Sequence, residues 1–151
     1  MEANLVGFLG AGLVLGLSAL GSGIGVGIAG SATIGAWKKS YINNKGASML
    51  LLAFTGAPMT QTFYGYITMG QIARATFERP DLGWLYVGFG LASGIGIGFS
   101  AIGQGMAGAA SADAQGETGK GFAQYMLIVG IAETVALFVM VLTMVSLRPT
   151  A

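Results

Sequence analysis

The chain has 151 residues, of which 54% are hydrophobic and 9% are charged, whereas soluble domains carry roughly 25% charged residues. It contains no cysteine and no histidine, which excludes a disulfide framework, imidazole metal ligands and imidazole proton relays. Its formal net charge of +1 provides no basic surface for a nucleic-acid partner.

Four apolar runs lie between the clusters of charged residues. Each run is longer than the ~20 residues with which a helix spans a bilayer, and only the last run contains a charged residue, Glu133. The runs cover residues 3–37, 46–73, 82–112 and 121–147. We therefore predict four transmembrane helices in a multi-pass integral membrane protein without a soluble domain.

The second half of the chain repeats the first half. When the first helices of the two halves are aligned, residues 12–23 match residues 94–105; we call this the first-helix alignment. When the second helices are aligned, residues 45–69 match residues 120–144 without a gap; we call this the second-helix alignment. The repeating unit is a pair of membrane helices. We predict an all-α membrane protein made of two tandem helical hairpins in parallel orientation, residues 1–76 and residues 77–151.

The first helix of each hairpin carries a line of small residues at steps of three and four, which places them on one helical face. Small residues on one face let helix backbones approach closely in a membrane. A dinucleotide-binding loop is excluded for the glycine-rich residues 21–30, because that loop follows a strand in a soluble βαβ unit. We expect no direct nucleotide binding. We assign packing in a crowded ring of helices to Gly12, Gly16, Gly23, Gly27, Gly94, Gly98 and Gly105.

Polar residues gather in the second apolar run, in the segment PMTQTFYG. Thr60 and Tyr64 are four residues apart and Gln61 and Tyr64 are three apart, so the three side chains share a helical face. Pro58 has no backbone N–H and disturbs the turn before it, which can release a carbonyl group. We expect this segment to present oxygen atoms inside the bilayer.

Glu133 lies near the middle of the fourth run. An ionisable group at this depth costs ~2.5 to 3.5 kcal/mol on insertion scales and marks a functional site. The lysines and arginines of the chain flank the helix ends. The carboxyl group of Glu133 must therefore be protonated, bind a cation or meet a basic residue of another chain. Gln104 in the third run lies about 12 residues before the turn near Gly116 and Glu133 about 17 residues after it. Because the turn itself takes up some of these residues, we expect the two side chains at a comparable depth.

Together these residues form an all-oxygen set that suits a hard cation. A single negative charge suits a monovalent ion, because the complex is then neutral in lipid. We predict a site for a monovalent cation formed by the side chains of Thr60, Gln61, Gln104 and Glu133. Two alternatives stay open: a proton carried by Glu133 while the glutamines only form hydrogen bonds, and a structural, pore-forming proteolipid without transport at Glu133. We expect no covalent cofactor.

The sequence resembles the proteolipid subunit, c or K, of V-type ATPases and V/A-type ATP synthases over essentially its whole length. The resemblance is carried by FSAIGQGMAG (99–108), IAETVALF (131–138) and PMTQTFYG (58–65). It implies a rotor ring of identical copies in a prokaryotic plasma membrane. The ring turns against a membrane stator subunit whose arginine faces the carboxylate, and it joins central stalk subunits. ATP is hydrolysed or made on a separate soluble head, so the subunit itself is not an enzyme.

The resemblance also implies roles for individual residues. In sodium-carrying members the ligand positions match the four residues of the predicted cation site, so the resemblance implies Na⁺ as the ion. The carbonyl ligand before the proline of the second helix matches the carbonyl of Ala57, and a tyrosine that matches Tyr64 holds the carboxylate. Glu133 matches Pro58 in the second-helix alignment, so the first hairpin has no carboxylate. The resemblance therefore implies one ion for every four helices.

Overall fold

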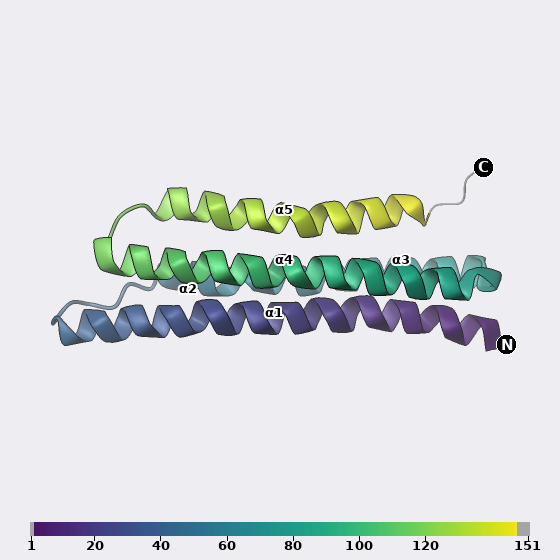
Figure 1. The fold of residues 1–151 in the computed structure, drawn as a ribbon, viewed down its shortest axis with the longest axis horizontal. Coiled ribbons are helices and arrows are strands. Elements are labelled where there is room, and N and C mark those ends of the chain that lie inside the picture. The colour runs from purple at the N-terminus through teal and green to yellow at the C-terminus, as the bar shows by residue number, and fades with distance from the viewer. Residues whose placement is uncertain (1, 148–151) are drawn as a thin grey trace.

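The computed structural model of the protein describes residues 2–147, so Arg148 and the ends of the two predicted hairpins, residue 1 and residues 148–151, lie outside the described residues. Every regular element within residues 2–147 is a helix. The elements are α1 (Glu2–Ile42), α2 (Leu51–Gly56), η1 (Ala57–Met59), α3 (Thr60–Glu78), η2 (Pro80–Leu82), α4 (Gly83–Thr118) and α5 (Phe122–Ser146). Figure 1 shows α1, α4 and α5 side by side, with α2 and α3 behind them.

The predicted all-α membrane architecture is confirmed, with one helix divided. Within the described residues, three uninterrupted helices are long and apolar enough to cross a membrane: Val6–Ile42, Pro80–Thr118 and Phe122–Ser146. The remaining predicted helix is present as α2, η1 and α3, which follow one another without an intervening loop. The helical spans also run past the apolar runs, since α1 continues to Ile42 and α4 to Thr118.

Pro58 explains why the second membrane helix is divided. Proline has no N–H with which to bond the carbonyl four residues earlier, and its ring crowds that turn. The backbone tightens into the 3₁₀ turn η1, in which the Thr60 N–H bonds the Ala57 carbonyl. The break therefore falls immediately before the polar residues at the start of α3.

The two hairpin turns lie at the same end of the molecule (Figure 1). In the second turn Gly119 and Gly121 adopt φ angles of 68° and 90°, a left-handed conformation that favours glycine. The last turns of α1 and α4 are joined there by an ion pair between Lys39 and Glu117. Both charged side chains are exposed, as expected where the ends of membrane helices reach water.

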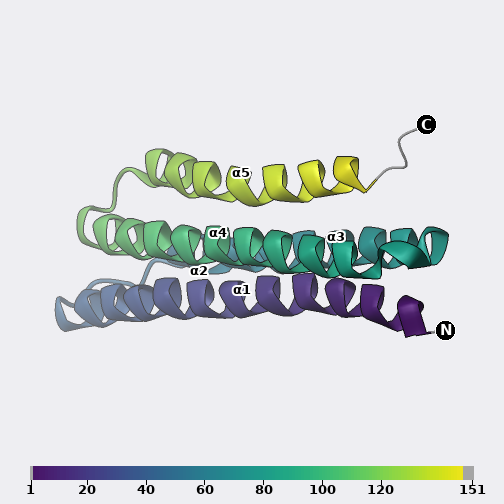
Figure 2. The ribbon, with the colours of Figure 1, turned by 45° about the vertical axis from the view of Figure 1, so that its right-hand side comes forward.

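Glycine lets α1 and α4 pack backbone to backbone along their length (Figure 2). A methyl group at any of several glycines would strike the backbone of the opposite helix. These glycines are Gly10, Gly21 and Gly25 on α1 and Gly90, Gly94, Gly98 and Gly105 on α4. Close helix approach through small residues is thus present within the single chain.

The two predicted glycine lines do not occupy equivalent places. The α4 line, Gly94, Gly98 and Gly105, packs against α1 of the same chain. The α1 line, Gly12, Gly16, Gly23 and Gly27, faces away: a Cβ atom built at any of them has no neighbour within 4 Å among the described residues. The reason is geometric, because two tandem copies of a hairpin that pack in parallel present opposite faces to each other. The sequence predicts the same packing role for both lines, but only the α4 line packs within the chain. Packing between copies stays a prediction.

Two apolar clusters bracket the middle of the bundle. On α4, Ile97 belongs to one cluster and Ala112 to the other, and Gln104 lies between them. On α5, Val129 and Ala136 bracket Glu133 in the same way. The fold thus places Gln104 and Glu133 in a polar layer between the two apolar clusters.

Candidate ion-binding site

Three helices bring the predicted side chains together in the polar layer. Gln61 comes from the first turn of α3, Gln104 from the middle of α4 and Glu133 from the middle of α5. Gln61 Nε2 donates to Gln104 Oε1 at 2.6 Å, and Gln104 Nε2 donates to Glu133 Oε2 at 3.2 Å. Both glutamine side chains are fully buried. Gln104 and Glu133 thus lie at the same depth.

Tyr64 completes the hydrogen bonding of the carboxylate. Its hydroxyl donates to Glu133 Oε1 at 2.5 Å, so each carboxylate oxygen accepts a bond from a different helix. The ion pairs found in residues 2–147 join residues near the helix ends, and none of them includes Glu133. Within residues 2–147 the carboxylate accepts hydrogen bonds from neutral donors.

The break at Pro58 supplies further oxygen atoms. Thr60 Oγ1 donates to the carbonyl of Ala57 at 3.0 Å and lies 3.3 Å from Gln61 Oε1. Because η1 turns the chain tightly here, a carbonyl, a hydroxyl and an amide oxygen lie next to each other beside the glutamine pair. Pro58 itself is buried and contributes through the backbone only.

Ser100 is a residue of this site that the sequence analysis did not single out. Its Oγ donates to the Ala132 carbonyl of α5 at 2.7 Å, directly before Glu133. Gln104 Nε2 also donates to the carbonyl of Val129 at 3.0 Å. A buried serine in a helix commonly bonds the carbonyl four residues earlier, as Ser18 does with Val14. The available signal was the spacing of four between Ser100 and Gln104, which puts both on one face of α4.

The chemistry of the site follows from its charges. Within the described residues there is no group of three or more histidine, cysteine or acidic side chains that could hold a metal ion. Glu133 is the one carboxylic acid among the site residues, and the others contribute neutral oxygens and N–H groups. One proton or one monovalent cation makes such a site electrically neutral, which is the condition for a low cost in lipid.

Comparison with known protein families agrees with the fold and the repeat. The model of the family described as the ATP synthase C subunit matches residues 9–72 and residues 87–146. The chain belongs to this ATP synthase family. One matched segment lies in each helical hairpin, and the two segments contain every residue of the polar layer. The chain is thus a duplicated member of the family, as the internal repeat indicates.

The chain is similar to a curated protein, the A-type ATP synthase subunit K of Methanocaldococcus jannaschii. The two proteins are 34% identical over 138 residues, which cover 91% of this chain and 60% of the relative. The chain therefore spans about 60% of the length of the curated relative that it matches.

Proposed function

We propose that this protein is a rotor-ring subunit of a V/A-type rotary ATPase or ATP synthase and that Glu133 carries Na⁺ across the membrane. The observation that carries the proposal is the carboxylate in the middle of α5, held by neutral donors from α3 and α4. Membership of the ATP synthase family and the name of the archaeal relative support the rotor assignment. The proposed location is a prokaryotic plasma membrane.

The proposed transport step uses charge neutrality. Glu133 and one Na⁺ form a neutral unit while the site faces lipid, so the crossing avoids the cost of a bare charge. At the stator subunit, an arginine of that other chain stabilises the empty carboxylate, and the ion leaves. The membrane potential supplies ~2.3 kcal/mol per charge per 100 mV. The ring of identical copies and the central stalk transmit this energy to the soluble head, where ATP chemistry takes place; the proposed subunit is not catalytic.

The oxygen atoms around Glu133 support sodium as the cargo. Ala57 offers its carbonyl, Thr60 its hydroxyl, and Gln61 and Gln104 their amide oxygens. These atoms together with the carboxylate form a hard-ligand set, and a proton needs none of them beyond the carboxylate. Sodium would take the place of hydrogen bonds between these groups, because each glutamine amide can present its oxygen instead of its N–H.

The same geometry supports a proton as the second candidate cargo. The bonds from Gln61 to Gln104 and from Gln104 and Tyr64 to Glu133 satisfy the carboxylate without any cation. A carboxyl group with two hydrogen-bond partners is a sufficient proton carrier. The two cargoes make opposite predictions about the effect of sodium on the reactivity of Glu133.

Carbodiimide labelling distinguishes the two cargoes, because the reagent needs the protonated acid. We expect Na⁺ to slow the modification of Glu133 in isolated membranes, and more strongly as pH rises, since proton and sodium compete for one site. Potassium or choline at the same ionic strength serves as the control, and Glu133→Gln should show no labelling. Equal labelling with and without sodium at every pH would establish the proton as cargo.

A further inference from the structure

The carbonyl group that Pro58 leaves without its helical partner lies against α4. Proline lacks the N–H that would bond the carbonyl four residues earlier, and Phe54 of α2 stands four residues before Pro58. A Cβ atom built on Gly108 of α4 would lie 2.7 Å from the carbonyl oxygen of Phe54. Phe54 and Gly108 are both buried. The break in the second membrane helix therefore brings a backbone carbonyl directly to the backbone of α4.

The internal repeat gives this contact a counterpart in the second hairpin. In the second-helix alignment, Phe54 matches Val129. The carbonyl of Val129 also meets α4, where it accepts a hydrogen bond from Gln104 Nε2. Gln104 and Gly108 are four residues apart, so the two matching carbonyls meet neighbouring turns of one face of α4. A side chain receives the carbonyl of the second hairpin, and a glycine admits the carbonyl of the first.

The contact between Phe54 and Gly108 lies close to the proposed cation ligands. On α4, Gly108 is one helical turn from Gln104. On the other side, α2, η1 and α3 follow one another without a loop, and Ala57 and Gln61 come three and seven residues after Phe54. A helix rises ~1.5 Å per residue, so these ligands lie within about 11 Å of the contact along the chain. A shift of Phe54 is therefore passed on to the oxygen atoms of residues 57–61.

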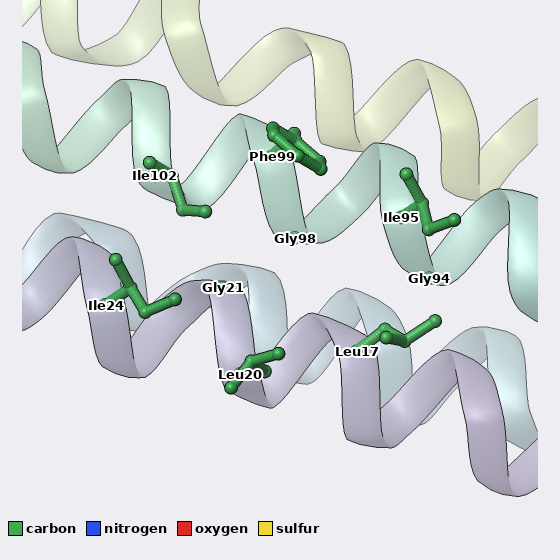
Figure 3. Close-up of a pocket in the computed structure, with 9 residues that line it drawn as sticks. All are labelled: Leu17, Leu20, Gly21, Ile24, Gly94, Ile95, Gly98, Phe99 and Ile102. Carbon is green, nitrogen blue, oxygen red and sulfur yellow. The ribbon is translucent and has the colours of Figure 1, made fainter.

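At this contact α4 is held more firmly than α2. Gly98 and Gly105 of α4 meet backbone atoms of α1, and Figure 3 shows Gly98 and Gly21 facing each other across the seam between the two helices. In contrast, α2 is a helix of six residues. Added bulk at Gly108 therefore displaces α2 and η1, while α4 keeps its place.

We propose that Gly108 is a positioning residue of the ion site, because its missing side chain sets the distance between residues 57–61 and Gln104. This distance decides which size of cation fits. The inference rests on the sodium function proposed above and adds a determinant of its selectivity. Cavity size, ligand number and flexibility decide which hard cation a protein site prefers. Gly108 itself supplies no ligand and acts through the position of the oxygen atoms of residues 57–61.

The direction of the effect follows from the clash that a methyl group would create. Ordinary contacts of a Cβ atom begin at 3.4 Å, so in Gly108→Ala the carbonyl of Phe54 must retreat by about 0.7 Å from its present 2.7 Å. Binding sites need their groups within about 0.5 Å of the productive geometry. The retreat widens the gap between residues 57–61 and Gln104. A wider site loses contact with a small cation first, so lithium is affected more strongly than sodium.

Carbodiimide labelling of Glu133 with lithium or sodium chloride measures this selectivity, with choline chloride holding the ionic strength constant. We expect Gly108→Ala to raise the sodium concentration that halves labelling on the order of tenfold. The lithium concentration should rise further, so that the lithium-to-sodium ratio of the two concentrations increases. Gly56→Ala is the matched control, because a Cβ atom at Gly56 of α2 has open space among the described residues. It should keep both concentrations and their ratio.

A second variant separates the contact with Phe54 from a general loss of packing. The methyl group of Gly108→Ala would also lie 3.3 Å from the Cβ atom of Ala29 on α1, a tight contact that Ala29→Gly removes. Ala29→Gly/Gly108→Ala keeps the clash with Phe54 and should show the same change in ratio. It also decides the question if limited proteolysis finds the single variant Gly108→Ala unfolded. A merely structural defect weakens protection by both ions alike and leaves their ratio unchanged.

The outcomes distinguish this inference from the sodium proposal. If sodium does not slow labelling of the natural protein, the sodium proposal and the selectivity role of Gly108 are both overturned. Sodium protection in the natural protein with an unchanged ratio in the Gly108→Ala variants overturns the role of Gly108 alone. A Gly56→Ala chain whose ratio changes as much as that of Gly108→Ala also overturns that role, because the effect then needs no contact with Phe54.

Discussion

The hydroxyl of Tyr64 on α3 donates a 2.5 Å hydrogen bond to Glu133 on α5 and so joins the two hairpins at the carboxylate. A hydrogen bond to a carboxylate oxygen is short and strong. It also fixes the direction in which the acid points. The first hairpin thereby contributes a hydrogen-bond donor to the carboxylate of the second hairpin.

Replacement of Tyr64 by phenylalanine should weaken ion binding without loss of the fold. The ring keeps its packing and only the hydroxyl is removed, so we expect a loss of ~1 to 1.5 kcal/mol, which is about five- to tenfold in sodium affinity. The measurement is the sodium concentration that halves carbodiimide labelling. Tyr66→Phe is the matched control, because Tyr66 lies on the same helix and is 60% exposed. An unchanged concentration for Tyr64→Phe would show that the hydroxyl does not act on the ion.

Glu133→Gln should leave the assembly intact and abolish ion-coupled ATPase activity. Glutamine keeps the shape of the side chain but lacks the charge that neutralises the cation. Native gels measure assembly, and reconstituted vesicles measure transport. Glu117→Gln is the control, since Glu117 is an exposed carboxylate paired with Lys39 outside the polar layer. Retained ion transport in the Glu133→Gln vesicles would remove Glu133 from the mechanism.

Gln61→Leu and Gln104→Leu should each raise the sodium needed for protection of Glu133. A ligand worth ~1 to 2 kcal/mol corresponds to about a tenfold change. Proton-dependent labelling without sodium should persist, because neither glutamine carries the charge. Gln71→Leu, on the same helix as Gln61 but outside the site contacts, should behave like the natural protein. If both leucine variants need no additional sodium, the glutamines are packing residues and the proton is the cargo.

Much of this site could be predicted from the sequence. The spacing of Thr60, Gln61 and Tyr64 defines one helical face, and the apolar surroundings single out Glu133 as the intramembrane charge. Local spacing and hydropathy determine such features, and the structure brings Gln61, Tyr64 and Gln104 to Glu133. The division of the second helix also follows from a local cause, the missing N–H of Pro58.

Other features depend on contacts between distant segments. The sequence shows two equivalent glycine lines, but only the packed fold reveals that Gly105 contacts α1 while Gly23 is open. The hydrogen bond from Ser100 to Ala132 is similarly invisible in the sequence. Ser18 occupies the corresponding position in the first hairpin and bonds its own helix instead. Identical residue types at equivalent repeat positions thus acquire different partners from their tertiary surroundings.

Ser100→Ala tests whether the bond to Ala132 positions Glu133. We expect the sodium needed for protection to rise about two- to tenfold, the equivalent of one hydrogen bond of ~0.5 to 1.5 kcal/mol. The pH profile of labelling should shift as well, because a displaced carboxylate would no longer be aligned with its hydrogen-bond donors, Tyr64 and Gln104. Ser100→Thr keeps a hydroxyl group, so its sodium requirement should stay close to that of the natural protein. Ser18→Ala is the matched control from the first hairpin, and an equal effect from both alanine variants would indicate general destabilisation instead of positioning.

Leucine at the two glycine lines should produce two different defects. Gly105→Leu places a branched side chain against the backbone of α1 at Gly25, so the two hairpins of one chain cannot pack and the monomer should become protease-sensitive. A Cβ atom built at Gly23 meets no described atom within 4 Å, so Gly23→Leu should leave the monomer resistant to protease. It should nevertheless block assembly, because we predict that the α1 glycine line packs against other helices of the ring.

Limited proteolysis and native gels read these two defects independently. Gly70→Leu provides the control, since a Cβ atom at this position on α3 also has open space among the described residues but lies outside both glycine lines. The Gly70→Leu chain should resist protease and should form the normal high-mass assembly. A Gly23→Leu chain that forms a normal high-mass assembly would contradict the packing role of the α1 line. A Gly23→Leu chain as protease-sensitive as Gly105→Leu would show that the α1 line acts within the chain and not between copies.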